Sequence, residues 1–318
     1  MTHEINLLLE WRAFRDQKYG TNISHKTKQI YSRAETILFD CIPEILHDLP
    51  ELVVAETDIH KRVVKQLCGV AQRRYPKLCP TSVNIYVRVW NTFWNALYRD
   101  EVLDKQPKIE KLKEHTKLRK ILSDEQILAV TSAKITPKHG LNLYRIHTML
   151  LAALGTGARL NEVLKIQARD VISAQNLLNI YSGKGAKQRV VPMSPSLAVR
   201  MHRFMSWRKV PKGNFIFGCK RNRNAAAKLK NPVLKHPYGK MSGSNVVRDL
   251  GLLCEHLAIR RFQFHGLRHT FATKYLKNGG DVARLRKLMG HSSIQTTMIY
   301  EHLDHADIIE NFTDYTPF

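Results

Sequence analysis

Four stretches in the first third of the chain repeat apolar residues at three- and four-residue spacing. This period places the apolar side chains of each stretch on one face of a helix, so we predict a helical domain over residues 1–104. Ser24 or Thr27 is suited to cap the second helix, because a hydroxyl can accept a hydrogen bond from the free amides at a helix start. The apolar positions are Ile5, Leu8, Leu9, Trp11 and Phe14; Ile30, Tyr31, Ala34, Ile37 and Leu38; the stretch 64–75; and Val83, Tyr86, Val87, Trp90, Phe93, Trp94 and Leu97.

This pattern stops after Asp104. Residues 105–120 are polar and basic and show no apolar periodicity, which indicates a basic linker between domains. A second domain is predicted over residues 121–318. It begins near Ser123, which together with Gln126 three residues later matches the pattern of a helix capping box.

Helical and strand-like patterns both occur in the second domain. Two β-like runs are separated by Gly183 and Gly185, and glycine suits the turn of a hairpin. We therefore predict a fold that is mainly α with a small antiparallel sheet, that is, an α+β second domain preceded by the helical one. The predicted elements are helices 144–154 and 159–164, strands 177–181 and 189–191, helix 196–207, and helices after Ser242.

Basic residues outnumber acidic ones almost two to one. The 318 residues include 51 Lys and Arg against 27 Asp and Glu, which gives a formal net charge of +24 and a pI near 10.0. Such a surplus favours a polyanionic partner, because every phosphate that is neutralised releases counterions. A general role in solubility explains it less well, since acidic residues serve solubility better. Nucleic acid is therefore the favoured partner.

Several basic residues are candidates for contact with DNA. In the first domain they could equally form a solvated helix face, but the overall charge favours DNA. The basic stretch 220–240 is predicted to be a loop, either disordered or in contact with the DNA backbone; the two possibilities are compatible. The candidates in the first domain are Arg73, Arg74, Lys77 and Arg88, and Lys187 is a further candidate in the second domain.

The remaining composition excludes other classes of protein. Five cysteines, an odd number without a C-x-x-C pair, indicate free thiols in a reducing compartment and no zinc site. The N-terminus lacks the pattern of a signal peptide, and the apolar run 149–154 is too short to span a bilayer. We therefore expect a cytoplasmic protein with no membrane segment, no metal and no cofactor.

Two arginines, two histidines and a tyrosine suggest chemistry on a phosphodiester. Guanidinium groups stay ionised and match phosphate oxygens with two parallel donors, which suits Arg159 and Arg268. A tyrosine such as Tyr300, with a pKa of about 10, needs help to lose its proton before it can attack phosphorus. Taken alone, Arg159 and Glu162 could be an ordinary surface ion pair three residues apart. The segment Gly155-x-Gly157 lacks the third glycine of a dinucleotide loop, and Gly183-Lys184 lacks the upstream glycine of a P-loop.

The second domain closely resembles the tyrosine recombinase, or phage integrase, family over residues of about 120–302. The resemblance rests on four segments in order, each with the expected residue types, while the N-terminal helices match more loosely. These segments are Gly155-Thr-Gly-Ala-Arg159-Leu-Asn-Glu162, Gly183-Lys184-Gly-Ala-Lys187, His265-Gly-Leu-Arg268-His-Thr-Phe-Ala-Thr273 and Leu288-Met-Gly-His291-Ser-Ser-Ile-Gln-Thr-Thr-Met-Ile-Tyr300.

The resemblance implies a catalytic role for six residues. Tyr300 would be the nucleophile, since it alone has the family spacing of nine residues after His291; Tyr315 is the competing tyrosine. His265 would be the base or proton relay, and His291 would hydrogen-bond the phosphate held by Arg159 and Arg268. Lys184 would be the general acid, with Lys187 as the second candidate because the register of the hairpin tip is open. Glu162 would orient Arg159.

The family resemblance also implies a reaction. The two domains would clamp double-stranded DNA. A site-specific recombinase cuts the DNA through a 3′-phosphotyrosine and rejoins it through a Holliday junction, as a tetramer on specific sites. Because the chain begins almost directly with the helical domain, we expect a simple recombinase of the Xer, integron or mobile-element type, with a short phage or island integrase as the other possibility. Two alternatives remain: an enzyme like a type IB topoisomerase, which would relax DNA without paired sites, and a non-catalytic DNA-binding protein, which should have lost Tyr300 or an arginine.

Overall fold

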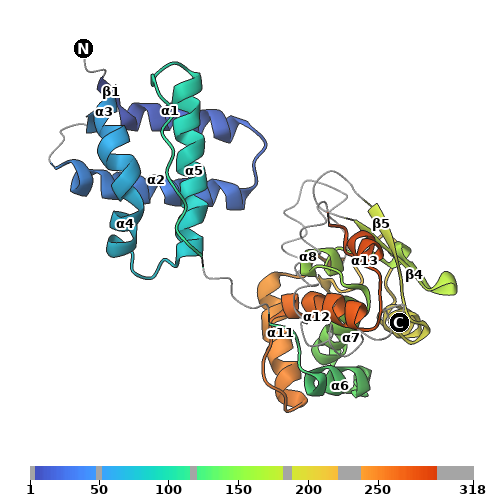
Figure 1. Ribbon diagram of the computed structural model, residues 1–318. Coiled ribbons are helices and arrows are strands. Elements are labelled where there is room, and N and C mark those ends of the chain that lie inside the picture. The colour runs from blue at the N-terminus through green and yellow to red at the C-terminus, as the bar shows by residue number, and fades with distance from the viewer. Residues whose placement is uncertain (1–3, 48–51, 115–119, 182–187, 221–237, 292–318) are drawn as a thin grey trace, which may run out of the picture. The chain divides into compact units, whose positions relative to one another are not determined.

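The computed structural model describes residues 4–47, 52–114, 120–181, 188–220 and 238–291. The chain divides into two units, Met1–Lys117 and Leu118–Phe318 (Figure 1). Within the described residues both units are mostly helical and their sheets are small and antiparallel, which confirms the predicted fold class. None of the described helices is long and apolar enough to cross a membrane.

Four long helices enclose the core of the first unit. The side chains of Trp11, Trp90, Phe93 and Trp94 are wholly buried there, and the Trp90 indole donates to the carbonyl of Ala34 at 3.0 Å. Ser24 is the residue that caps the second helix, since its side chain accepts from the amide of Thr27. These helices are α1 (Leu7–Gly20), α2 (His25–Leu46), α4 (Val64–Arg74) and α5 (Pro80–Arg99).

The first unit also contains elements that the apolar pattern did not predict. Strand β1 (Glu4–Asn6) pairs antiparallel with β2 (Val53–Ala55), and α3 (Glu56–Asp58) and a π-helical turn (Ile59–Val63) precede α4. Ile5 therefore lies in a strand rather than in the first helix. Leu9, predicted to lie on the apolar face of this helix, is 60% exposed, because Leu7, Trp11 and Phe14 form the buried face of α1 and Leu9 points away from it.

The segment after α5 is tied to the first unit, which differs from the featureless linker expected over 105–120. Asn91 forms a pair of hydrogen bonds with the backbone of Ile109, at 2.9 and 2.8 Å, and Asn84 does the same with Leu112. Ile109 itself is buried in the core of this unit. Asn84 and Asn91 lie seven residues apart, which is two helical turns, and therefore on one side of α5. Their side chains satisfy backbone groups of a segment that is not part of a strand.

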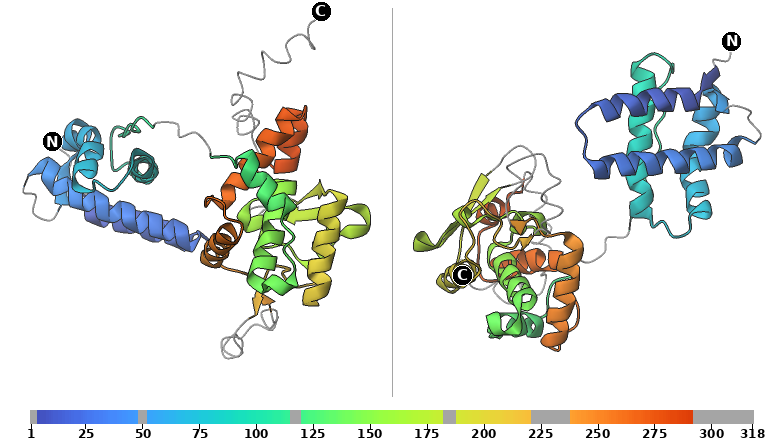
Figure 2. Two further views of the ribbon diagram at one scale, coloured as in Figure 1. Left: turned by 90° about the horizontal axis from the view of Figure 1, so that it is seen from below. Right: turned by 180° about the vertical axis from the view of Figure 1, so that it is seen from behind.

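Helix α7 (Leu141–Thr156) occupies the middle of the second unit, where α6, α9, α11 and α12 pack against it (Figure 2). Ten of its sixteen residues are buried, which explains the continuous apolar run 149–154 in its sequence. The capping box of Ser123 and Gln126 is present at the start of α6. These four helices are α6 (Asp124–Ser132), α9 (Pro195–Arg208), α11 (Gly243–His256) and α12 (Phe264–Lys277), and α13 (Val282–Met289) packs against α12.

A three-stranded antiparallel sheet in the order β3-β4-β5 completes the second unit. Strands β4 (Leu177–Tyr181) and β5 (Gln188–Pro192) form the predicted hairpin, with Ile180 opposite Arg189, and β3 (Val171–Ile172) pairs with β4. Strand β5 packs against α13, and β4 against the short helix α8 (Leu160–Val163). Two short strands, β6 (Cys219–Lys220) and β7 (Tyr238–Gly239), pair with each other; the predicted basic loop between them lies outside the described residues.

Candidate active site

The turn at the end of α7 positions the first candidate residue. Gly157 has φ +65°, and a Cβ there would lie 2.5 Å from the ring of Phe271, so this left-handed conformation and close approach require glycine. The turn reverses the chain and starts α8, with Arg159 as the residue that precedes its first turn. The carbonyl of Gly157 is left facing α12.

Arg159 and Glu162 interact through both main chain and side chain. The Arg159 amide donates to one carboxylate oxygen of Glu162 at 2.8 Å, and its guanidinium donates to the other at 3.0 Å. The Glu162 side chain is buried, whereas that of Arg159 remains 39% exposed. The pair is therefore not a simple surface ion pair: the carboxylate holds an arginine whose outer face is open to solvent.

Arg268 comes from α12 and is 2% exposed. Its guanidinium donates to the carbonyls of Gly157 at 2.6 Å and Met289 at 2.7 Å, and to Nε2 of His291 at 2.8 Å. Arginine has no acceptor, so Nε2 of His291 must be unprotonated in this contact and the ring proton belongs on Nδ1. Arg268 thereby joins the ends of α7 and α13.

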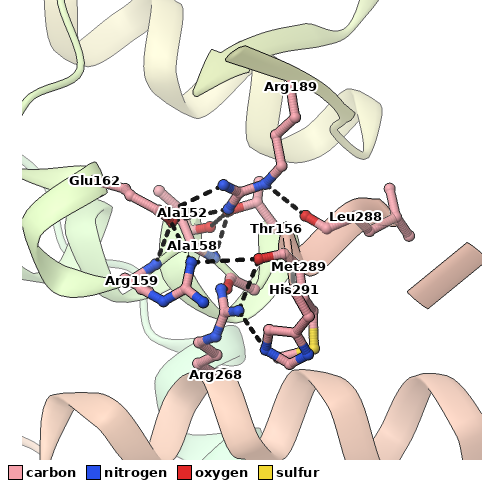
Figure 3. Close-up of polar contacts among 11 residues, drawn as sticks. Ala152, Thr156, Ala158, Arg159, Glu162, Arg189, Arg268, Leu288, Met289 and His291 are labelled. Carbon is pink, nitrogen blue, oxygen red and sulfur yellow. Dashed lines mark hydrogen bonds and ion pairs between the residues drawn. The ribbon is translucent and has the colours of Figure 1, made fainter. Parts of the chain in front are cut away.

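One backbone carbonyl brings the two arginines together. Met289 O, in the last turn of α13, accepts from Arg268 and also from Arg159, at 3.5 Å (Figure 3). Gly290, at φ +62°, then ends the helix and directs His291 toward Arg268. The structure thus places Arg159, Arg268 and His291 in one cluster, although they lie up to 132 positions apart in the chain.

His265 lies on α12 as predicted, one turn before Arg268, but its side chain is exposed while that of Arg268 is buried. Its ring packs edge-on against the ring of His269, with 4.5 Å between the centroids. The spacing of three residues therefore does not by itself bring His265 onto the same acceptors as Arg268.

Arg189 is a member of the cluster that the sequence analysis missed. It extends from β5 and donates to both oxygens of Glu162, at 3.1 and 2.8 Å. The signal was present in the strand pattern: Arg189 stands opposite buried Ile180 and two residues before buried Val191, hence on the inward side of the hairpin. An inward arginine requires a buried acceptor, and Glu162 is that acceptor.

The electrostatics of the cluster favour an anion. Burial would raise the pKa of Glu162, but hydrogen bonds from Arg189 and from the Arg159 amide, with the charges of both guanidiniums, lower this pKa to about 2. Glu162 is therefore ionised at neutral pH. It offsets one of the three guanidinium charges of Arg159, Arg189 and Arg268, and the cluster keeps a net positive charge suited to phosphate.

Other predicted residues stand apart from this cluster or are not described. Lys184, Lys187 and Tyr300 lie outside the described residues. The candidate DNA contacts of the first unit are exposed. Arg73 and Arg74 share Glu44 as an ionic partner, at 3.1 and 3.7 Å, and at least half of each side chain remains exposed. The other two exposed candidates are Lys77 and Arg88.

Comparison with known proteins identifies the chain. The profile of the Phage integrase family matches residues 120–307, more than half of the sequence. The chain belongs to this family. Among curated relatives, the tyrosine recombinase XerD of Lacticaseibacillus casei is 29% identical over 240 residues, which cover 72% of this chain and 75% of XerD. The tyrosine recombinase XerA of Pyrococcus horikoshii is 28% identical over 241 residues, 72% of this chain and 75% of XerA.

Solved structures show the same fold for this tyrosine recombinase. The Tn1549 transposon integrase in complex with transposon right end DNA matches with a TM-score of 0.69 at 18% identity, over 98% of this chain and 99% of that one. A lambda integrase dimer bound to a core site matches with a TM-score of 0.65 at 13% identity, over 95% of this chain and 79% of that one. Family membership makes the protein an enzyme that cleaves and rejoins DNA, and it does not favour the topoisomerase or non-catalytic alternatives.

Proposed function

We propose that this recombinase cuts specific DNA sites with Tyr300 and that Arg159, Arg268 and His291 hold the scissile phosphate. The observation that carries the proposal is the cluster itself. The guanidiniums of Arg159 and Arg268 donate to one carbonyl oxygen, that of Met289, and Arg268 also donates to His291. A phosphate bound beside this cluster would meet the exposed part of the Arg159 guanidinium and the positive charge of both arginines. Removing a donor of this kind costs about 10²–10³ in rate at comparable sites.

The steps of the proposed cleavage balance without a metal or a nucleotide. The phenolic oxygen of Tyr300 attacks phosphorus while its proton passes to His265, and the bond from phosphorus to the 5′ oxygen breaks. Lys184, or Lys187 if the hairpin tip has the other register, donates the proton that the leaving 5′ oxygen needs. The products are a 3′-phosphotyrosine and a free 5′-hydroxyl. Attack by the 5′-hydroxyl of a partner strand reverses the step and exchanges strands through a Holliday junction.

We further propose that the recombinase acts as a homo-tetramer on two duplexes, in the cytoplasm. One structural neighbour is a lambda integrase tetramer bound to a Holliday junction, with a TM-score of 0.63 at 14% identity. Strand exchange between two duplexes requires four cleaved strands, and one Tyr300 per subunit supplies one cleavage each. The net charge of +24 supports binding to long DNA segments.

A covalent-adduct assay tests the function. The wild type is incubated without metal with DNA segments that flank its own gene, and denaturing gels show whether protein becomes covalently attached. Tyr300→Phe should abolish the adduct, whereas Tyr98→Phe, at an exposed position of the first unit, should retain it. Adduct formation that is equal in wild type and Tyr300→Phe would refute the nucleophile. Site-independent relaxation of supercoiled plasmids would favour the topoisomerase-like activity instead.

A further inference from the structure

Arg189 occupies an unusual place for a charged residue. Its side chain is 12% exposed and projects from β5 toward the cluster rather than toward solvent. Ordering a long, charged side chain in the interior is costly unless its donors are matched by acceptors. The donors of Arg189 are matched by acceptors, so its hydrogen bonds hold the side chain in place in addition to neutralising the charge of Glu162.

The acceptors of Arg189 come from two separate elements. Glu162 of α8 accepts two hydrogen bonds from it, and the carbonyl of Leu288 in α13 accepts from its Nε at 2.6 Å. Its guanidinium also borders Gly290, where an added Cβ would approach it to 3.0 Å. Figure 3 shows Arg189 reaching Glu162 and Leu288 from the strand side, opposite Arg268.

Two groups of the proposed site depend on these contacts. Glu162 is the carboxylate that orients Arg159, so Arg189 and Arg159 share one anchor. Leu288 immediately precedes Met289, whose carbonyl receives both site arginines, and His291 follows two residues later. A shift of the 288–291 turn would therefore move an acceptor and a histidine of the site together.

We propose that Arg189 is a positioning residue: it couples the β4–β5 hairpin to Glu162 and to the 288–291 turn, and so sets the geometry of Arg159 and His291 for cleavage. This inference rests on the proposed function of the same cluster. Arg189 need not touch DNA for this role, because it acts through Glu162 and through the backbone of α13. A displacement of about 1 Å in such a site can cost about 100-fold in rate.

The test compares three variants of the full-length protein. Arg189→Met keeps the length of the side chain and removes its donors, Arg189→Lys keeps the charge but not the paired donors, and Arg203→Met removes one exposed positive charge from α9 as a control. For each variant we would measure DNA affinity, thermal stability and the rate of covalent-adduct formation at saturating DNA. The rate is measured at about pH 5–8, a range centred on the ordinary histidine pKa of about 6.5.

We expect Arg189→Met to cleave about 100-fold more slowly than wild type while its DNA affinity changes no more than that of Arg203→Met. Its cleavage rate should also fall toward the acid end of the range. Glu162 loses the hydrogen bonds and the charge of Arg189, so burial raises its pKa against the contacts of Arg159 alone. Adding Glu162→Gln to Arg189→Met should remove that acid dependence. Arg189→Lys should be less impaired than Arg189→Met.

Several results would overturn the inference and leave the function in place. If the wild type forms the adduct and Arg189→Met forms it at the same rate and with the same pH profile, the inference is refuted. It is also refuted if weaker DNA binding explains the whole loss of rate in Arg189→Met. If Arg189→Met does not fold, a folded Arg189→Lys with the wild-type rate and pH profile refutes it as well. Absence of any adduct from the wild type would instead count against the proposed function itself.

Discussion

Arg268 and Arg159 hold similar acceptors but differ in burial, and this difference separates their roles in stability and in catalysis. Replacing Arg268 by alanine leaves the buried carbonyls of Gly157 and Met289 without their strongest donor, and we expect a loss of about 3 kcal/mol in the free energy of unfolding. Arg159→Ala removes a partly exposed group and should cost about 1 kcal/mol or less. Urea denaturation measures both changes.

Cleavage should respond to both substitutions in the same way. Each removes one guanidinium from the proposed phosphate site, so adduct formation by the folded variants should fall by about 10²–10³-fold. A folded Arg159→Ala that cleaves at the wild-type rate would contradict the role of this residue. Equal losses of unfolding free energy in the two variants would contradict the prediction that the buried arginine, Arg268, contributes more to stability than Arg159.

At the scale of single residues, the sequence carried the family motifs but not all of their surroundings. Arg159, Glu162, Arg268 and His291 were predicted from their segments, and the structure brings them together. Met289 was not, because its contribution is a main-chain oxygen and any side chain at that position leaves the same atom. The role of His265 was implied by the family resemblance, and neither the motif nor its three-residue spacing from Arg268 fixes which of the two side chains is buried.

At the scale of elements, His147 joins three helices of the second unit. This buried histidine of α7 bonds the carbonyl of Val130 in α6 through Nε2, at 2.8 Å, and accepts from Arg200 of α9 at Nδ1, at 2.9 Å. Nε2 must carry the proton, because a carbonyl only accepts. Burial, partly offset by the hydrogen bond to Val130, and the charge of Arg200 lower the pKa of His147 to about 4.

The sign of the resulting pH dependence follows directly. Between about pH 6.5, the ordinary pKa of histidine, and about pH 4, the unfolded chain binds a proton at His147 that the folded chain does not. The free energy of unfolding therefore falls as the pH decreases through this window, by up to about 3 kcal/mol from this residue. His147→Gln should flatten the curve, and His202→Gln, at an exposed position of α9, should not.

Denaturation curves in urea at a series of pH values provide the measurement. Glu162 also makes the free energy of unfolding fall as the pH decreases, as His147 does, but at lower pH. Its window lies between its ordinary pKa of 4.5 and its lowered pKa of about 2. The loss of stability below about pH 4.5 should therefore remain in His147→Gln. An identical slope above that pH in wild type and His147→Gln would contradict the prediction.

The segment after α5 yields a prediction at the same scale. Asn91→Ala removes two hydrogen bonds to Ile109, each contributing about 1 kcal/mol, and should release the segment locally. Limited digestion with trypsin should then cut faster at Lys105, Lys108 and Lys111. Asn22→Ala, at an exposed position before α2, is the control and should leave the cutting rate unchanged. Equal rates in all three proteins would contradict the tie.

The elements that the sequence predicted well are those with a long apolar period. The helices of both units and the β4–β5 hairpin fall where the pattern placed them, because burying one face of a helix or strand dictates the period. Strand β1 is three residues long and too short to show alternation. The segment 105–112 has no period at all, since side chains of another element, Asn84 and Asn91, satisfy its backbone.

At the scale of the whole molecule, the surplus of positive charge predicts strong dependence of DNA binding on salt. A protein that contacts six to ten phosphates should lose roughly 10³–10⁵ in affinity between about 50 and about 200 mM salt. Fluorescence anisotropy with labelled duplex DNA measures the slope. An affinity that is flat over this range would show that the net charge of +24 does not act on DNA.

The same measurement tests the candidate contacts of the first unit. Arg88→Ala and the pair Arg73→Ala with Arg74→Ala should each lower the salt slope, by about one for every phosphate contact removed. Arg99→Ala is the control, because Arg99 is exposed and pairs with neighbouring Asp100. Slopes equal to that of the control would identify the candidates as a solvated face.

The shared carbonyl of Met289 has a consequence for how this site would be mapped by mutagenesis. Side-chain scanning is blind to an atom that every amino acid carries, so replacing Met289 should report only on packing, while the oxygen that receives Arg159 and Arg268 persists. Backbone chemistry can reach it. An ester in place of the amide between Met289 and Gly290 alters no side chain. It weakens that oxygen as an acceptor and also removes the Gly290 N–H, which donates to the carbonyl of Lys287. A loss of cleavage in the ester would therefore show that the main chain of this turn is a working part of the site.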